Sequence, residues 1–592
     1  MPGGYHNRFI DIDLARETFD IGEADRELQD RFLGGKGLGL ALLCTIDRSE
    51  DPLDPGNPLI FLTGPLTGST ITTSNRSCVV TRSPLTGGFL DSHAGGHSGT
   101  GIKLSGYDYA VIRGKASSPV YLKISRDGAQ FSGASSLWGK GCFETESTLK
   151  QKNPKGTVMS VGPAGENLVR YACINTELYR QYGRGGAGAV MGSKNLKAVV
   201  FEGDEKVRYH DAARFRGLSK QVTKDIVAHP VRELRVEYGT TMWVRKGHEE
   251  GGFLPTSNWR KGRFDGYENI TSEVYTKDFQ WQAKGCHNCV IQCSKLARYD
   301  GKEIEGPEYE TAAYLGSNCE LDDPKDLLIA NELCDDLGLD SISTGGNISF
   351  IMEAAERGLL SPEENEWIKF GSGEAIHRLI KMIAAREGIG NTMAEGTRKA
   401  SKQVGNNSEY FAMQIAGMEL SGVNPMGCYS HALALTTSDF ASHTRVWTAT
   451  DEMAGNLDFD MLPRYIAKQQ DEKNVKNCVI VCDFFMLPHD RLAPMIEAAT
   501  GLPTTTEGMF DIGERIHSLA RLYNLRTGRT HKDDTLPERM FTEPILSNMM
   551  KGRVIDRDFF EGQLQEYYKL RGWDEEGKPM KETLERLNVE KF

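Results

Sequence analysis

The stretch Cys286-His-Asn-Cys289-Val-Ile-Gln-Cys293 brings three cysteines together in the spacing C-x2-C-x3-C. Thiolates gathered this closely suit zinc or an iron–sulfur cluster. A structural zinc site usually closes with a second ligand pair nearby, but the next cysteine, Cys319, stands alone. We therefore expect a [4Fe–4S] cluster whose fourth ligand comes from a distant segment, where Cys478 and Cys482 are the candidates. A zinc knuckle or three ordinary thiols is the alternative interpretation.

The composition is that of an ordinary globular protein, with 39% hydrophobic and 26% charged residues among 592. The net charge of −12 argues against nucleic acid as a partner, because phosphate binding needs clustered Lys and Arg. No window approaches the roughly eighteen apolar residues of a membrane span, and the N-terminus lacks the apolar core of a signal peptide. We expect a soluble, cytoplasmic protein in a reducing compartment.

Strands and glycine-rich loops are expected to dominate the first two hundred residues or so. Strand-like apolar stretches occur at 8–14, 59–62, 78–81, 109–113 and 196–201. Glycine allows close backbone approach to a ligand, and isolated arginines in the same loops can bind phosphate. These loops indicate a large phosphate-bearing ligand, although a sheet protein with many tight turns is the alternative. The glycine-rich run 34–39 lacks the spacing of a phosphate loop, so we expect a turn entering a helix.

From about residue 208 the pattern becomes helical. Asp323 suits an N-cap, Pro324 a first helical turn and Gly338 the position after the last turn, which predicts a helix between them. We expect three domains: a β-rich domain at 1–207, a mainly helical domain with the cysteine cluster at 208–416, and a second helical domain at 417–592.

Five motifs together resemble the tungsten-dependent aldehyde:ferredoxin oxidoreductase family, over about residues 8 to 540. These motifs are the cysteine triplet, Gly162-Pro-Ala-Gly-Glu-Asn167, Gly188-Ala-Val-Met-Gly-Ser-Lys-Asn195, Gly306-Pro-Glu-Tyr-Glu-Thr311 and Asp335-Asp-Leu-Gly338-Leu-Asp340. The resemblance implies an α+β fold in which an N-terminal base of two β-sheets carries two mainly α-helical domains. These domains would enclose a metal bound by two pyranopterins, with a [4Fe–4S] cluster close by and magnesium bridging the pterin phosphates. Tungsten and molybdenum share ligands and geometry, so both stay open.

The family's cofactor contacts can be carried onto matching positions. Pterin contacts would fall on Arg76, His93, Gly95, Arg184, Gly185, Asp335, Leu339, Asp340, Arg445, Asn477 and Val481. His93 replaces a common Asn, and its backbone carbonyl would help to bind the magnesium. Cys482 aligns as the fourth cluster ligand. Asn477 replaces a pterin-binding Asp and Ile480 replaces a Gly, which we expect to weaken the second pterin contact. For the charged residues, surface salt bridges are the alternative.

Oxidation of an aldehyde to an acid removes two electrons and adds a water oxygen, so the protein must activate water and move protons. Those tasks call for one carboxylate and one imidazole. The resemblance puts them at Glu310, as a base toward water or the hydrated aldehyde, and at His443, which would hydrogen-bond an oxygen of the substrate or of the metal. A surface carboxylate and a satisfied core histidine are the alternatives. His93, His97 and His248 are further candidates for the cavity.

The resemblance implies that electrons pass to a ferredoxin or to iron–sulfur and flavin partner subunits, in a homodimer or a hetero-oligomer. The runner-up interpretation is a benzoyl-CoA reductase-like member of the same family, with Cys319 as a candidate metal ligand. A non-catalytic iron–sulfur electron-transfer subunit and a zinc-stabilised structural protein are the remaining alternatives.

Overall fold

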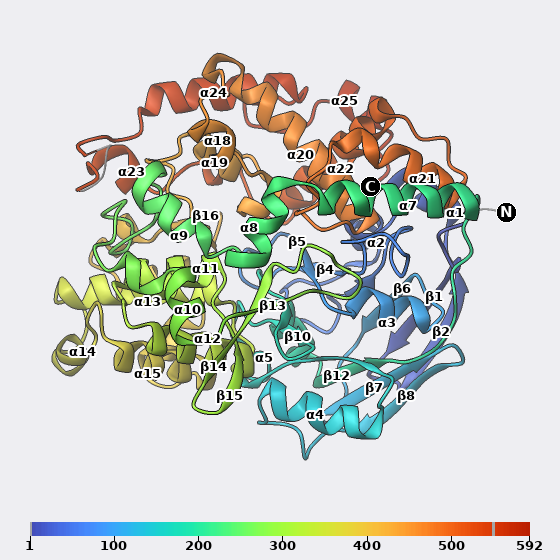
Figure 1. Cartoon of the computed structure of the whole chain (residues 1–592), viewed down its shortest axis with the longest axis horizontal. Coiled ribbons are helices and arrows are strands. Elements are labelled where there is room, and N and C mark those ends of the chain that lie inside the picture. The colour runs from blue at the N-terminus through green and yellow to red at the C-terminus, as the bar shows by residue number, and fades with distance from the viewer. Residues whose placement is uncertain (1–2, 547–550) are drawn as a thin grey trace.

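The computed structural model describes residues 3–546 and 551–592. Two six-stranded sheets form the base, seen in blue and cyan in Figure 1. The first sheet has the order β2-β1-β6-β3-β4-β5, with strands β1 (Arg8–Asp13), β2 (Thr18–Glu23), β3 (Leu59–Leu62), β4 (Ser77–Arg82), β5 (Phe89–Ala94) and β6 (Tyr109–Arg113). The second has the order β11-β10-β9-β12-β7-β8, with strands β7 (Val120–Ser125), β8 (Gly128–Gly133), β9 (Thr157–Ser160), β10 (Ile174–Thr176), β11 (Arg180–Tyr182) and β12 (Leu196–Phe201).

The two sheets share one hydrophobic core. Alternating apolar residues such as Ile10 on β1 and Leu122 on β7 are fully buried in it, which is the pattern of strands that cover a core with one face. The rings of Phe61 on β3 and Phe201 on β12 meet edge to face, with their centroids 5.8 Å apart. Each sheet is mostly antiparallel, with one parallel pair: β1 with β6, and β12 with β7. The predicted two-sheet base is confirmed.

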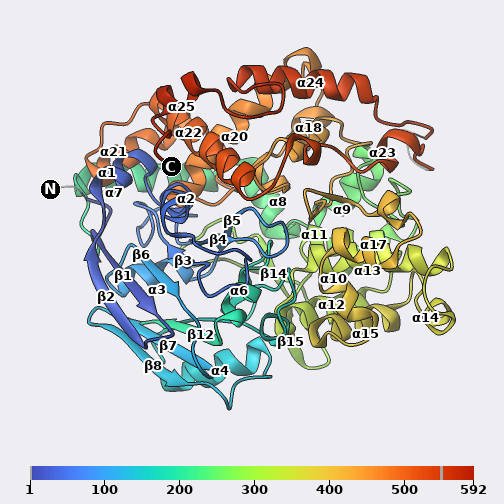
Figure 2. The same ribbon diagram turned by 180° about the vertical axis from the view of Figure 1, so that it is seen from behind.

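Helices cover the base in two groups. The middle of the chain forms most of one group, which contains α8 (Pro230–Tyr238), α9 (Met242–Lys246), α10 (Ser272–Asp278), α11 (Tyr309–Thr311), α12 (Pro324–Leu337), α13 (Ser341–Glu356), α14 (Pro362–Trp367), α15 (Gly373–Ala385), α16 (Ile389–Met393) and α17 (Thr397–Val404). Helix α7 (Ala212–Val227) instead lies beside α21 (Ala493–Thr500) of the other group (Figure 1). The middle group also holds a small sheet of β13 (Gln282–Lys284), β14 (Ser294–Tyr299) and β15 (Lys302–Glu305), while β16 (Gln414–Ile415) and β17 (Met418–Glu419) form a short hairpin. The C-terminal group contains α18 (Ser430–Thr436), α19 (Ala449–Met453), α20 (Leu462–Val479), α21 (Ala493–Thr500), α22 (Thr506–Arg526), α23 (Arg539–Thr542), α24 (Arg557–Leu570) and α25 (Lys581–Leu587). In Figures 1 and 2 the C-terminal helices run across the top of the molecule and the middle helices α12 to α15 lie beside the sheets.

Local signals in the sequence explain where α12 begins and ends. The side chain of Asp323 accepts hydrogen bonds from the backbone N–H groups of Lys325 and Asp326, and Pro324 occupies the first turn. Gly338 ends the helix in the left-handed conformation, with φ +75°. The helix predicted after Asp323 is therefore confirmed, and Leu339, directly after its end, pairs with Ala172 of the base.

The helices of the N-terminal base include α1 (Arg26–Phe32), α2 (Gly35–Ile46), α3 (Ser98–Leu104), α4 (Cys142–Lys152), α5 (Pro163–Glu166) and α6 (Ala187–Ser193). The glycine-rich run 34–39, expected as a turn entering a helix, forms the first turns of α2 itself, and only Gly34 lies before the helix as its N-cap. A Cβ at Gly37 would lie 3.0 Å from the sulfur of Cys478, and one at Gly39 would lie 2.5 Å from a methyl carbon of Val80. The glycines thus let α2 pack closely between β4 and α20. Within the described ranges, none of the helices has the length and apolar composition that crossing a bilayer requires.

Candidate active site

A cavity of about 560 Å³ lies where the two-sheet base meets both helical groups. Strand β5, the loop around Arg184, the cysteine segment, residues 308–310 and the segments 440–447 and 477–486 all contribute to its wall. The cavity therefore gathers segments that are hundreds of residues apart in the chain.

Four cysteines line this cavity: Cys286, Cys289, Cys293 and Cys482. All four are free thiols, and a hydrogen bond of 2.9 Å from the backbone N–H of Cys482 to the carbonyl oxygen of Thr73 holds the fourth in place. Cys478, the other candidate, is buried against α2 and does not line the cavity. A Cβ at Gly95 would lie 2.7 Å from the sulfur of Cys286, so this position needs glycine.

The spacing of the sulfurs is wider than a single zinc ion would require. Zinc binds thiolates at about 2.3 Å, which sets the sulfurs of a tetrahedral site about 3.8 Å apart. Among the described residues, one group offers three potential ligand atoms within 4.8 Å of one another, and that group contains none of the four cavity cysteines. No three of the described cavity sulfurs are grouped this closely, which suits a larger, multinuclear centre better than a single zinc ion.

Guanidinium groups surround the four cysteines. Arg76 Nη1 donates a hydrogen bond of 3.1 Å to the sulfur of Cys482, and Arg180 forms an ion pair of 2.8 Å with Glu305. Burial lowers the pKa of Arg76, but the sulfurs of Cys482 and Cys286 outweigh that effect and the pKa is raised. Cations placed here stabilise thiolates, which are the form of cysteine that binds metal.

Glu310 and His443 meet at the wall of the same cavity. The backbone N–H of Gly422 donates a hydrogen bond of 2.8 Å to Glu310 Oε2, which leaves Oε1 free. Oε1 lies 3.2 Å from His443 Nδ1, yet neither buried atom has the geometry of a hydrogen bond with any partner among the described residues. Buried polar atoms normally have partners, so this pair fits a third, oxygen-bearing molecule between or beside them.

Burial favours the uncharged form of both side chains. Burial raises the pKa of Glu310 to about 7, although the hydrogen bond from Gly422 opposes the shift. Burial, reinforced by the charge of Arg184, lowers the pKa of His443 to about 3. Near neutral pH the imidazole is therefore uncharged and the carboxyl group exchanges its proton, which suits proton transfer better than a permanent ion pair.

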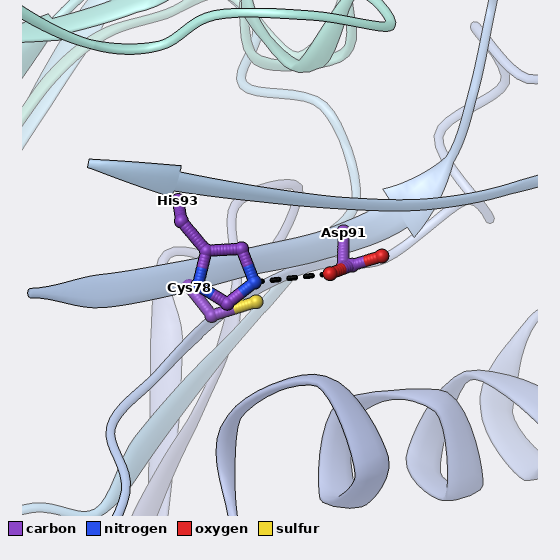
Figure 3. A group of neighbouring side chains, drawn as sticks. All are labelled: Cys78, Asp91 and His93. Carbon is purple, nitrogen blue, oxygen red and sulfur yellow. Dashed lines mark hydrogen bonds and ion pairs between the residues drawn. The ribbon is translucent and has the colours of Figure 1, made fainter. Parts of the chain in front are cut away.

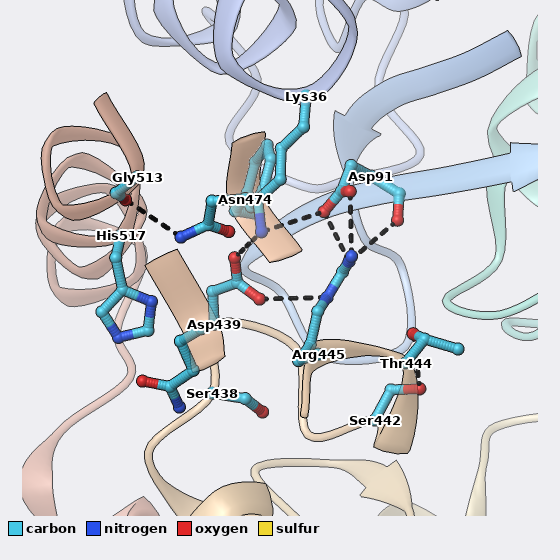
Figure 4. A network of polar contacts seen from close by, with 12 residues as sticks. Lys36, Asp91, Ser438, Asp439, Ser442, Thr444, Arg445, Asn474, Gly513 and His517 are labelled. Atoms are coloured by element: carbon cyan, nitrogen blue, oxygen red, sulfur yellow. Dashed lines mark hydrogen bonds and ion pairs between the residues drawn. The ribbon is translucent and has the colours of Figure 1, made fainter. Parts of the chain in front are cut away.

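Beside the cavity lies a buried group of two carboxylates and two cations, shown in Figure 4. Arg445 contacts both oxygens of Asp91, at 2.5 and 3.1 Å, and lies 3.2 Å from Asp439. Lys36, fully buried, forms an ion pair with Asp439 and lies 3.9 Å from Asp91. The four charges balance, and they fix the guanidinium of Arg445 at the cavity wall.

The group with three closely spaced ligand atoms is Cys78, Asp91 and His93, drawn in Figure 3. Asp91 already neutralises Arg445 and Lys36, and one of its oxygens lies 3.0 Å from His93 Nε2. Burial raises the pKa of the Cys78 thiol, which contacts the carbonyl oxygen of Val79. We therefore interpret this group as an end of the charge network and not as a metal site.

The positions assigned to the pterin separate into two sets. Seven line the cavity: Arg76, His93, Gly95, Arg184, Arg445, Asn477 and Val481. Four lie behind its wall: Gly185, Asp335, Leu339 and Asp340. Asp340 caps α13 and accepts a hydrogen bond of 3.2 Å from Arg184 Nε, while Asp335 accepts one of 2.5 Å from Gln181 Nε2. Both carboxylates thus orient side chains that do line the cavity.

Several expectations for other residues differ from the structure. His248 stacks on Tyr267 with 3.7 Å between ring centroids and does not line the cavity. His97 pairs with Glu177 and is 51% exposed. Cys319 is buried, with its sulfur 3.2 Å from the carbonyl oxygen of Tyr314, and also lies outside the cavity. The candidate metal ligand of the runner-up interpretation is therefore a buried thiol away from the cavity.

Sequence reasoning missed residues whose partners are remote in the chain. Lys36 and Asp439 are 403 residues apart, and the ring of Trp243 lies 5.1 Å from that of Trp447. Arg180, beside the cysteines, had no motif to mark it. Each of these residue types has many uses, so a single sequence offers no signal that could have singled them out.

Known proteins resemble this chain along its whole length. The family model described as "Aldehyde ferredoxin oxidoreductase, N-terminal domain" matches residues 9–203, and "Aldehyde ferredoxin oxidoreductase, domains 2 & 3" matches 217–589. The tungsten-containing aldehyde ferredoxin oxidoreductase of Pyrococcus furiosus is 36% identical, covering 100% of both chains. From the same organism, an aliphatic sulfonate oxidoreductase WOR-like subunit is 31% identical, covering 99% of this chain and 97% of the relative. A solved structure of the BamBC active-site complex of benzoyl coenzyme A reductase has a chain with a TM-score of 0.87 and 24% identity, covering 100% of this chain and 98% of that chain, which shows a shared fold.

Proposed function

Because the chain belongs to the aldehyde ferredoxin oxidoreductase family of oxidoreductases, we propose that it oxidises aldehydes to carboxylic acids at a tungsten or molybdenum pyranopterin centre. A [4Fe–4S] cluster would pass the electrons to a ferredoxin or to an iron–sulfur or flavin partner subunit. One observation carries this proposal. Glu310 Oε1 and His443 Nδ1 lie close together without a hydrogen-bond partner among the described residues, in the same cavity as four free cysteines.

The residues present fit both cofactors. Cys286, Cys289, Cys293 and Cys482 would hold the cluster, since thiolates are its usual ligands. Arg76, which lines the cavity and has no carboxylate partner among the described residues, suits a pterin phosphate, because a guanidinium offers paired N–H donors. Arg184 and Arg445 are paired with Asp340 and Asp91, and they would offer only their remaining N–H groups. Asn477, in place of an aspartate, keeps an acceptor oxygen and adds donors. The backbone carbonyl of His93 is the candidate for the bridging magnesium, although it now accepts a hydrogen bond of 3.2 Å from Arg76.

The protein's own part in the reaction is binding and proton transfer. The metal centre, when bound, would supply the two-electron oxidation in one-electron steps. Glu310 removes a proton from water while the water oxygen bonds to the carbonyl carbon of the aldehyde. The neutral imidazole of His443 orients the substrate oxygen. Overall, an aldehyde and water give a carboxylic acid, two protons and two electrons. Two oxidised one-electron iron–sulfur carriers take up the electrons.

Other features of the proposal concern the setting of the enzyme. The cavity cysteines are partly exposed, so a cluster there needs a reducing compartment, and we propose the cytoplasm. The net charge of −12 gives no general attraction for an acidic ferredoxin, so a bound subunit or a local basic area would guide the carrier. We propose a homodimer or a complex with smaller subunits.

The test uses protein purified without oxygen. Metal analysis should find about four irons and one tungsten or molybdenum per chain. Aldehyde-dependent reduction of ferredoxin or benzyl viologen should fall by about 10²- to 10⁴-fold in Glu310→Gln, with metal content unchanged. Glu366→Gln, an exposed position on α14, is the matched control. Iron without tungsten or molybdenum would favour the electron-transfer subunit, and zinc without iron would overturn the proposal.

A further inference from the structure

Two tryptophans, Trp243 and Trp447, form an aromatic wall beside His443. Trp243 on α9 and Trp447 both line the cavity, and their rings meet edge to face with centroids 5.1 Å apart at 63°. The imidazole of His443 lies 6.2 Å from Trp447, at 78°. A molecule that reaches the Glu310–His443 contact therefore lies against aromatic carbon on one side.

Hydrogen bonds and ring contacts fix this wall relative to the reacting groups. Trp447 Nε1 donates to Thr450 Oγ1 at 2.8 Å, and the rings of Trp447 and His431 meet edge to face with their centroids 5.8 Å apart. The backbone N–H of Trp243 donates to the carbonyl oxygen of Thr240 at 3.0 Å. The hydroxyl of Thr240 accepts a hydrogen bond of 2.9 Å from the N–H of Tyr309, the neighbour of Glu310. The wall and the carboxylate are thus parts of one packed unit.

The cations that act on His443 are already neutralised. Arg184 pairs with Asp340 at 3.2 Å, Arg445 pairs with Asp91 at 2.5 Å, and Lys473 pairs with Asp483. Arg235 stacks on Phe484, with 3.8 Å between its guanidinium carbon and the ring centroid, and acts on Cys293 and Cys482. A negatively charged substituent placed against the wall would therefore be desolvated beside cations that already have carboxylate partners.

We propose that Trp243 and Trp447 select the substrate by its carbon substituent and favour aldehydes that carry a flat aromatic or other uncharged apolar group. This inference rests on the proposed function of the Glu310–His443 site. Aromatic rings that meet edge to face or offset attract one another beyond the gain from burial. An acetaldehyde methyl group is too small to use the wall, so the tryptophans should matter little for it.

The first experiment compares kcat/KM for benzaldehyde and acetaldehyde in the holoenzyme and its variants. Trp447→Leu should lower the value for benzaldehyde about tenfold, mainly through KM, and change that for acetaldehyde by less than about twofold. Trp447→Phe should recover most of the loss. Trp367→Leu, on α14 outside the cavity, should leave both values unchanged. Equal losses for both aldehydes, or none, would overturn the proposal.

Charge is tested with 4-formylbenzoate, which adds a carboxylate to the same ring. Its kcat/KM should be at least about tenfold below that of benzaldehyde, because the cations near His443 are paired. A value equal to or above that of benzaldehyde would overturn the preference for uncharged groups.

A binding measurement separates this inference from the proposed function. Benzamide is flat, neutral and not an aldehyde, and calorimetry should show that Trp447→Leu binds it about tenfold more weakly than the wild type. If no aldehyde is oxidised but this difference in affinity is found, the role of the tryptophans is supported and the proposed aldehyde oxidation is overturned. If both aldehydes are oxidised and benzamide binds the wild type and Trp447→Leu equally, the role of the tryptophans is overturned and the proposed aldehyde oxidation is supported.

Discussion

Ile480 repeats at the end of α20 the backbone conformation that Gly338 adopts at the end of α12. Their φ angles are +58° and +75°, and each N–H donates to the carbonyl oxygen four residues earlier, at Lys476 and Cys334. The turn that delivers Cys482 to the cavity is therefore retained although glycine is replaced by a β-branched residue. Such a residue is rarely found in the left-handed region, because its Cβ crowds the backbone.

The first prediction concerns the stability of these two turns. Ile480→Gly would relieve about 1–2 kcal/mol of backbone strain. It would also remove a side chain that is 1% exposed, and such truncations cost about 2–5 kcal/mol. We expect a net loss of about 1–3 kcal/mol in the free energy of unfolding, measured by denaturant titration. A more stable Ile480→Gly protein would show that strain dominates.

Gly338→Ala is the matched change at the other turn. It adds a Cβ at φ +75° that would lie 3.0 Å from the backbone nitrogen of Gly162, with no strain to relieve. We expect it to destabilise by about 1–2 kcal/mol. Unchanged stability would mean that the α12 turn can relax in a way that its packing against Gly162 does not suggest.

The second prediction concerns pH. Because burial raises the pKa of Glu310 to about 7, the basic form of this carboxylate becomes dominant only as the pH rises through neutrality. If Glu310 is the base, kcat should rise with pH and reach half its plateau near pH 7. His443, with a pKa lowered to about 3, stays uncharged over the same range and adds no second step.

Stopped-flow reduction of the enzyme by a saturating aldehyde, followed from pH 5 to 9, would measure this profile. Glu310→Gln should remove the rise and leave a low, flat rate. A wild-type profile that is flat across neutrality would assign proton removal to another group.

The third prediction concerns the buried charge network. Lys36→Met leaves two carboxylates facing one cation in a region where the Lys36 and Asp91 side chains are 0% exposed. Breaking a buried ion pair by removing one partner costs about 3–5 kcal/mol, since the remaining charge is left unbalanced. We expect a loss of that size in the free energy of unfolding.

The double variant Lys36→Met/Asp439→Asn restores neutrality and should be more stable than Lys36→Met alone. A double-mutant cycle on Lys36 and Asp439 measures their interaction free energy. Purely additive effects would show that the network is held by packing and not by charge.

Local signals in the sequence account for part of what the structure contains. Asp323 and Gly338 mark the ends of α12 because caps act within a few residues, and alternation of apolar residues marks the strands of the base. The cysteine triplet can be recognised for the same reason, because its three members lie within eight residues of one another. The contacts of Lys36 with Asp439 and of Trp243 with Trp447 join segments that no local rule connects, so only the fold could show them.

The family motifs assign cofactor contacts to residues, and the structure shows which of these residues line the cavity. Asp335 and Asp340, which we expect to contact the pterin, lie behind the cavity wall, and each accepts a hydrogen bond from a side chain that lines it, Gln181 or Arg184. The site residues and the domain limits at 207 and 416 stay predictions. An aligned position gives the residue type, whereas contact with a ligand depends on side-chain direction, which packing decides.

The last prediction concerns electron transfer and rests on the proposed cluster. Arg76 Nη1 donates a hydrogen bond of 3.1 Å to the sulfur of Cys482 and brings a positive charge to it. Both effects stabilise the more negative, reduced form of an iron–sulfur cluster, so Arg76→Gln should make its reduction potential more negative. A loss of about 1.4 kcal/mol in this preference corresponds to about 59 mV for a one-electron couple. Redox titration followed by electron paramagnetic resonance would measure the shift, with iron content as a check on assembly. Arg76→Lys keeps the charge and should shift the potential less, while Arg126→Gln, which changes a side chain that is 65% exposed, should not shift it. An unchanged potential in Arg76→Gln would show that the contact with Cys482 is structural, and a shift equal to that of Arg76→Lys would assign the effect to hydrogen-bond geometry and not to charge.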